Sequence, residues 1–176
     1  MAKLTCDPIC LEIQYCEIGD HQWIGYKIAF WSGVQSIINP ALQEKNINGP
    51  LSTSDTYFLA NEYQGETLIS TIREVLDSGA PLYWQPIEPD VSIAFYPRVD
   101  FPFTELPQPP FKKVVDEDTP ITVVAVIDAY NFHPQMDAYM GNGPALVLIT
   151  NGLALRTFLH ELESDFGSFR QKTHFK

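Results

Sequence analysis

Two stretches near the start of the chain have apolar side chains at every second position, and this pattern restricts the possible fold more than any other feature of the 176 residues. The first stretch runs from Ile9 to Tyr15 and the second from Ile24 to Phe30. A period of two is typical of a β-strand with one buried face. Because the turn-forming pair Gly19-Asp20 stands between them, we expect an antiparallel hairpin.

Further strand patterns follow along the chain. We expect a short strand over Val34–Ile38 and a second hairpin from Leu82–Trp84 and Val91–Phe95, whose turn is rich in proline. The segment Ile121–Ile127 is apolar at nearly every position, which is typical of a strand buried on both faces and predicts a place inside a sheet. Ala145–Ile149 repeats this apolar pattern.

Two other stretches have helical spacing. The apolar residues of the first fall on one stripe of a helix predicted over residues 62–78, with a glycine at its end. The second helix is predicted over Leu153–Phe166, with Thr150 or Asn151 as its N-cap and Gly167 as its stop.

The order of these elements lacks a regular β-α-β alternation, which disfavours a doubly wound parallel sheet. We therefore expect an α+β fold, with an antiparallel sheet or sandwich of about seven strands and two packed α-helices. Residues 1–176 are interpreted as a single domain, since a chain of this length can bury a core of its own. Within it, residues 97–120 contain six prolines, which block strand pairing and predict a long loop.

Acidic residues outnumber basic residues by 22 to 11, which gives a formal net charge of −11. Direct binding of nucleic acid is disfavoured, because affinity for phosphates depends on clustered cationic side chains. A basic protein is the natural electrostatic partner, although the same acidity also serves solubility alone. The longest apolar run, Ile121–Ile127, is too short to cross a membrane, and no stretch after Met1 resembles a signal peptide, so we expect a cytoplasmic protein.

The sequence predicts neither a metal site nor a cofactor. Its three cysteines, Cys6, Cys10 and Cys16, are clustered and odd in number, which favours free thiols over a disulfide framework, and the paired spacing of a zinc site is missing. No phosphate-binding glycine loop or nucleophile elbow is present, so catalysis is not the expected role. Asp128 and His133 come nearest to an acid–base pair, yet an aspartate after a strand more often begins a turn.

The proline-rich stretch is the best candidate for a surface that binds a partner. Its acidic end, Asp116-Glu117-Asp118, is expected to be solvated and to steer a basic partner during encounter. Aromatic side chains of the same stretch are candidates for the buried centre of an interface, where such residues contribute most. These candidates are Phe101, Phe103 and Phe111.

Two short patterns carry a resemblance to a known family. The run Glu88–Phe95 follows a predicted helix, and the later helix has the spacing Leu155-x-x-Phe158-Leu159-x-x-Leu162. In these patterns the chain resembles the small immunity proteins of bacterial toxin systems, in particular the WapI type. The resemblance implies a protein that occludes a toxin without chemistry of its own, and an acidic surface would suit a basic nuclease toxin.

Two other interpretations stay open. A small-ligand-binding or enzymatic β-rich domain would use Asp128, His133 and the aromatic residues of the strands. A structural interaction protein would dock its proline-rich loop on a larger assembly.

Overall fold

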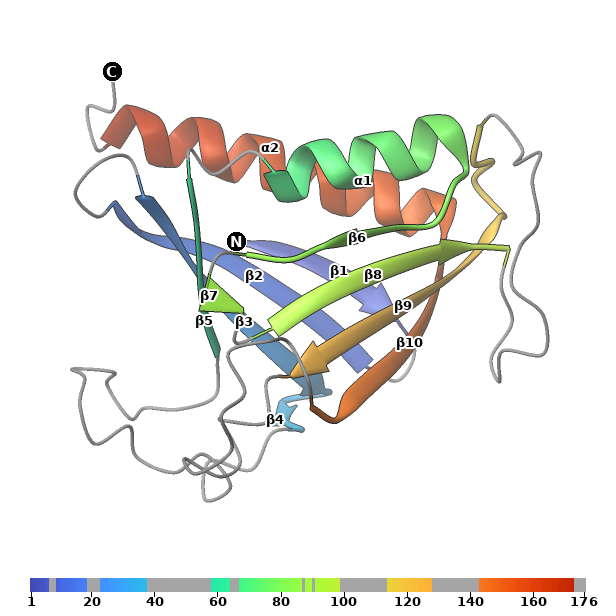
Figure 1. The fold of residues 1–176 in the computed structure, drawn as a ribbon, viewed down its shortest axis with the longest axis horizontal. Helices are drawn as coiled ribbons and strands as arrows, with labels where there is room; N and C mark the ends of the chain where they lie inside the picture. The colour runs from blue at the N-terminus through green and yellow to red at the C-terminus, as the bar shows by residue number, and fades with distance from the viewer. Residues whose placement is uncertain are drawn as a thin grey trace.

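The computed structural model describes residues 1–6, 9–18, 23–37, 58–63, 67–86, 88–89, 91–98, 114–127 and 143–172. Within these residues the chain has the expected α+β fold, with two antiparallel sheets and two helices (Figure 1). No helix in the described ranges is long and apolar enough to span a membrane.

Sheet A is built on the hairpin that the sequence predicts, and its strands follow the order β1-β2-β3-β5-β7, with β4 paired to β3. The central pair is β2 and β3, in which Tyr15 stands opposite Tyr26, and a bulge after Tyr15 shifts the register. The strands are β1 (Ala2–Cys6), β2 (Ile9–Ile18), β3 (Trp23–Ser32), β4 (Gln35–Ser36), β5 (Phe58–Tyr63) and β7 (Glu88–Pro89).

Sheet B contains β10, β9, β8 and β6 in that order, so the predicted interior position of Ile121–Ile127 is confirmed. The predicted pairing of Leu82–Trp84 with Val91–Phe95 is also confirmed. The strands are β6 (Leu82–Trp84), β8 (Val91–Pro97), β9 (Pro120–Ile127) and β10 (Ala145–Asn151).

The two helices pack against each other and against both sheets. Helix α1 (Thr67–Ser78) buries the apolar stripe that its spacing predicts, and α2 (Gly152–Lys172) is capped at its start by Asn151, whose Oδ1 accepts a hydrogen bond from the Ala154 N–H at 2.9 Å. Figure 1 shows both helices along one side of the molecule. Their buried residues share one apolar core with the inner faces of the two sheets.

The predicted end of the second helix at Gly167 is wrong, because α2 continues to Lys172. Aromatic packing explains the extension. The rings of Phe166 and Phe169 lie 5.1 and 5.7 Å from the ring of Tyr15 on β2. This tertiary contact outweighs the cost of about 1 kcal/mol for a glycine inside a helix.

The first helix was predicted to begin too early, since residues 58–63 form strand β5 and α1 begins at Thr67. Pairing with β3 gives β5 its place and brings Tyr63 beside Trp23 and Phe58 beside Phe30. Such long-range partners are invisible to local spacing. The expected strand Val34–Ile38 is shorter as well, and β1 was not predicted at all.

Candidate functional site

The acidic end of the proline-rich stretch lies on a well-defined turn, which we call the acidic turn (Val114–Thr119). The side chains of Asp116, Glu117 and Asp118 are all exposed, as expected. The three aromatic candidates, Phe101, Phe103 and Phe111, lie outside the described residues, as do Asp128 and His133. The structure therefore places only the acidic part of the predicted surface.

Backbone hydrogen bonds fix the acidic turn to the ends of both helices. The Val115 N–H donates to the carbonyl oxygen of Leu76 in the last turn of α1, at 2.9 Å, and the Val115 side chain is buried in the core. At the start of α2, Gly152 N–H donates to Thr119 O at 3.0 Å and Leu153 N–H donates to Glu117 O at 2.9 Å. The exposed carboxylates thus stand on a backbone that two helices hold in place.

Two arginines support the same turn through its backbone. The guanidinium of Arg98 donates to Val114 O at 2.9 Å, and that of Arg156 donates to Val115 O at 2.6 Å. Arg98 has a φ of 61°, a left-handed conformation that is uncommon outside glycine, and its N–H donates to Pro120 O at 2.7 Å. Both guanidinium groups donate to backbone carbonyls of the turn, in which Asp116, Glu117 and Asp118 are exposed residues.

A second polar site, which sequence reasoning missed, surrounds the buried carboxylate of Glu62 on β5. Its side chain accepts hydrogen bonds from Tyr26 O–H, the Thr67 N–H and hydroxyl, and the Trp84 indole N–H. The Thr67 N–H reaches Oε1 at 3.1 Å and the Trp84 Nε1–H reaches Oε2 at 2.8 Å. The Glu62 cluster therefore ties β3, β5, the start of α1 and β6 together.

The pKa values within the Glu62 cluster follow from its burial. Removal from water raises the pKa of the Glu62 carboxyl, and hydrogen bonds from Tyr26, Trp84 and the first residues of α1 offset part of this effect. Burial and the neighbouring Glu62 also raise the pKa of Tyr26, so its hydroxyl keeps its proton and acts as a donor. Four donors satisfy both carboxylate oxygens, an arrangement suited to holding structure together rather than to binding a substrate.

The raised pKa of Glu62 predicts a pH dependence of stability. A carboxyl group with a raised folded-state pKa binds its proton more tightly in the folded chain than in the unfolded chain. The stabilisation that this proton binding gives to the folded chain is therefore fully present below the ordinary carboxyl pKa of 4.5, and it is lost as pH rises through the raised pKa of Glu62. We expect the free energy of unfolding of the wild type, minus that of Glu62→Gln, to fall over this window in urea titrations at a series of pH values. A difference that rises with pH would mean that the donors lower the pKa instead.

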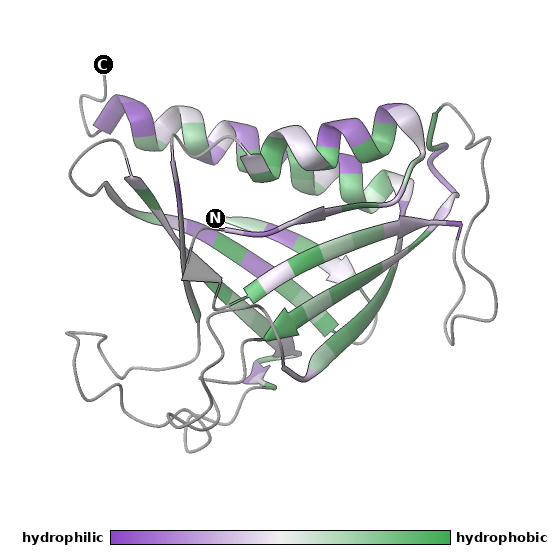
Figure 2. Ribbon diagram, in the orientation of Figure 1, coloured by the Kyte–Doolittle hydropathy of each residue, from purple (hydrophilic) through white to green (hydrophobic). Residues whose placement is uncertain are grey.

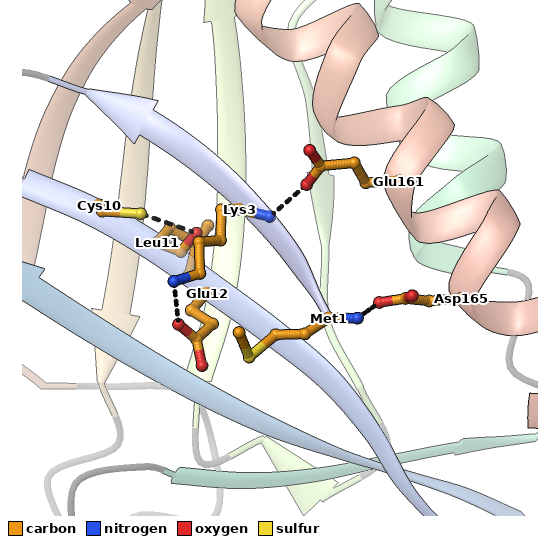
Figure 3. Close-up of polar contacts among 7 residues, drawn as sticks. All are labelled: Met1, Lys3, Cys10, Leu11, Glu12, Glu161 and Asp165. Carbon is orange, nitrogen blue, oxygen red and sulfur yellow. Dashed lines mark hydrogen bonds and ion pairs between the residues drawn. The ribbon is translucent and has the colours of Figure 1, made fainter.

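In the described part of the chain the cysteines do not belong to a metal-binding group. Cys6 faces the core, and burial raises the pKa of its thiol to about 11, whereas Cys10 lies on the opposite face of sheet A. Figure 3 shows Cys10 near the Lys3–Glu12 ion pair, whose Nζ and Oε2 atoms are 3.2 Å apart. Among the described residues no three His, Cys, Asp or Glu side chains gather closely enough to hold a metal ion.

Comparison of the chain with protein-family models, with curated proteins and with solved structures gave no match. The function must therefore be argued from the two sites themselves.

Proposed function

We propose that this chain is a non-catalytic binding protein that occludes a basic protein partner, with the acidic turn as part of its contact surface. The observation that carries the proposal is the combination of exposure and rigidity at Asp116, Glu117 and Asp118. Their side chains face solvent, while the backbone beneath them is hydrogen-bonded to both helices. A charged surface that is already ordered loses little conformational entropy when it binds.

The charge of the whole chain supports the same partner class. With a net charge of −11, the protein attracts basic surfaces at long range and repels acidic ones. Occlusion of a basic toxin, as in immunity proteins of the WapI type, is the specific form of this function that we propose. Phe101, Phe103 and Phe111 are proposed as its buried apolar contacts.

The proposal is tested by removing the three charges without changing the size of the side chains. The variant Asp116→Asn, Glu117→Gln, Asp118→Asn is compared with a control that loses the same charge away from the acidic turn, Glu12→Gln, Glu74→Gln, Glu163→Gln. Basic proteins captured from the source cell by the wild type are identified and purified, and their binding kinetics are measured at low and high salt. We expect the acidic-turn variant to associate several-fold more slowly, with a weaker salt dependence and a nearly unchanged dissociation rate, because exposed charges act mainly on encounter.

The control variant separates a local effect from a general one. Its association rate should stay closer to the wild-type value, since its charges lie outside the proposed surface. Equal slowing in both variants would show that net charge alone attracts the partner, and unchanged kinetics in the acidic-turn variant would overturn the proposal.

A further inference from the structure

Among the residues that the structure describes, the outer face of sheet B carries no charged side chain. Along β8 and β9, alternate residues face the core and the others face outward. Strand pairing aligns the outward residues in rows across the sheet, and one row is Tyr83, Ala94, Val124 and Val147. The outward residues are Tyr83, Ser92, Ala94, Tyr96, Thr122, Val124, Val126, Ala145, Val147 and Ile149. Figure 2 shows how continuously hydrophobic β9 and β10 are.

This neutral face contrasts with the outer face of sheet A. There, Lys3 and Glu12 form an ion pair and Lys27 lies on the neighbouring strand, as is usual for a sheet face in contact with water. Tyr83 and Ile149 lie at the two edges of the sheet B face and are 66% and 50% exposed. Thr122, on the central strand β9, is buried. The described strands of sheet B thus place no charge on this face, although the chain has 33 charged Lys, Arg, Asp and Glu residues (11 + 22).

The absence of charge restricts what can cover this face. A partner that brought a charged side chain onto it would bury that charge without a counter-ion, which costs several kcal/mol. The basic partner proposed for the acidic turn is therefore a poor match for sheet B. A surface that is equally neutral and apolar is a good match, and a second copy of the same face is one.

The size of the face sets the strength of such a contact. Strand β6 has three residues and the other three strands have seven or eight, so at ~3.3 Å per residue and about 4.8 Å between strands the face covers roughly 400 Å² per copy. This is within the usual size of the largest apolar patch on a monomer, which is often functional, whereas a stable interface needs about 800 Å² per partner. The face therefore suits a weak, reversible pair.

We propose that two copies of this chain associate through the outer faces of their sheets B, in a dimer that forms at high protein concentration. Apolar contact drives it, and the −11 charge on each copy opposes it. Added salt screens this repulsion and should strengthen the dimer, which is the reverse of what salt does to a contact between opposite charges.

Sedimentation equilibrium of the intact protein over a wide range of concentrations tests the proposal. We expect the average mass to rise from that of one chain towards that of two, and to rise further at high salt. Val147→Glu and, at the opposite edge, Tyr83→Ser should each raise the dimer dissociation constant, the first by about tenfold or more, because it places an unpaired charge in the contact.

Val34→Glu is the matched control. Val34 is 94% exposed and lies beside β4 of sheet A, so the same substitution there should leave the dissociation constant unchanged. Melting curves of each variant check that the fold persists, and two variants at opposite edges guard against one of them failing to fold. A wild type that stays monomeric at all concentrations and salt levels, or a dimer that Val147→Glu and Tyr83→Ser leave intact, would overturn the proposal.

Discussion

Replacing Glu62 by alanine is expected to lower the free energy of unfolding by roughly 1–3 kcal/mol, because one buried donor loses its carboxylate acceptor. This donor is the Tyr26 hydroxyl, whereas Thr67 is exposed at the start of α1, where water can replace the lost acceptor of its N–H. The Trp84 indole keeps a partner, since its Nε1–H also reaches the Thr67 hydroxyl at 3.0 Å. Urea denaturation followed by tryptophan fluorescence measures the loss.

Glutamine at the same position gives a sharper test of the hydrogen-bond geometry. Each oxygen of Glu62 accepts from one N–H that cannot turn away, the Thr67 backbone on Oε1 and the Trp84 indole on Oε2. The amide NH₂ of a glutamine would have to face one of them, so either the Thr67 N–H loses its acceptor or the Trp84 indole is left with the Thr67 hydroxyl alone, at a cost of about 1 kcal/mol. Glu74→Ala, on the exposed side of α1, is the control and should change stability by no more than about 0.5 kcal/mol. A similarly small effect at Glu62 would show that the cluster does not stabilise the fold.

The same residue shows where prediction from sequence succeeds and where it stops. Strands whose own side chains alternate, such as β2, β3 and β8, were predicted because burial of one face leaves a pattern within the segment. Glu62 occupies an inward position of β5, where a strand pattern would require an apolar residue. Because Glu62 is charged, the alternation was not visible, and the residue was predicted to begin a helix. The donors to Glu62 come from β3, α1 and β6. A local sequence pattern cannot predict partners that lie on three different elements.

The candidate surface was predictable in part for a similar reason. Three consecutive acidic residues must meet water, so the exposure of Asp116, Glu117 and Asp118 followed from their chemistry alone. The rigidity of their backbone did not, because it depends on Leu76 of α1 and Gly152 of α2, which lie far away in the sequence.

Replacing Gly152 by alanine is expected to destabilise the protein by roughly 2–4 kcal/mol, from about 1–3 kcal/mol of overpacking and ~1 kcal/mol for a displaced hydrogen bond. A Cβ atom at this position would lie 2.1 Å from the carbonyl oxygen of Asp116 and 2.9 Å from Val115 Cγ1. The carbonyl belongs to the backbone, so the acidic turn itself must move away from α2. Thermal and urea unfolding measure the loss of stability.

The same helix offers a control with the opposite sign. Gly167→Ala places its Cβ in open space, with nothing within 4 Å, and should stabilise the protein by about 0.5–1 kcal/mol through helix propensity. Comparison of Gly152→Ala with Gly167→Ala separates the steric effect of the acidic turn on stability from the general stabilisation of a helix by alanine. If Gly152→Ala also stabilises the chain, the turn is not packed against α2 as described.

The packing of β1 against α2 has a consequence for how the chain folds during synthesis. The Lys3 N–H donates to Glu161 Oε2, across 158 residues of sequence, and Met1 pairs with Asp165 (Figure 3). Ala2 and Leu4 belong to the same core as α2, so on the ribosome they remain uncovered until nearly all of the 176 residues have been made. Contacts between such distant segments make folding slow, and the nascent chain must keep β1 from aggregating until α2 has been made.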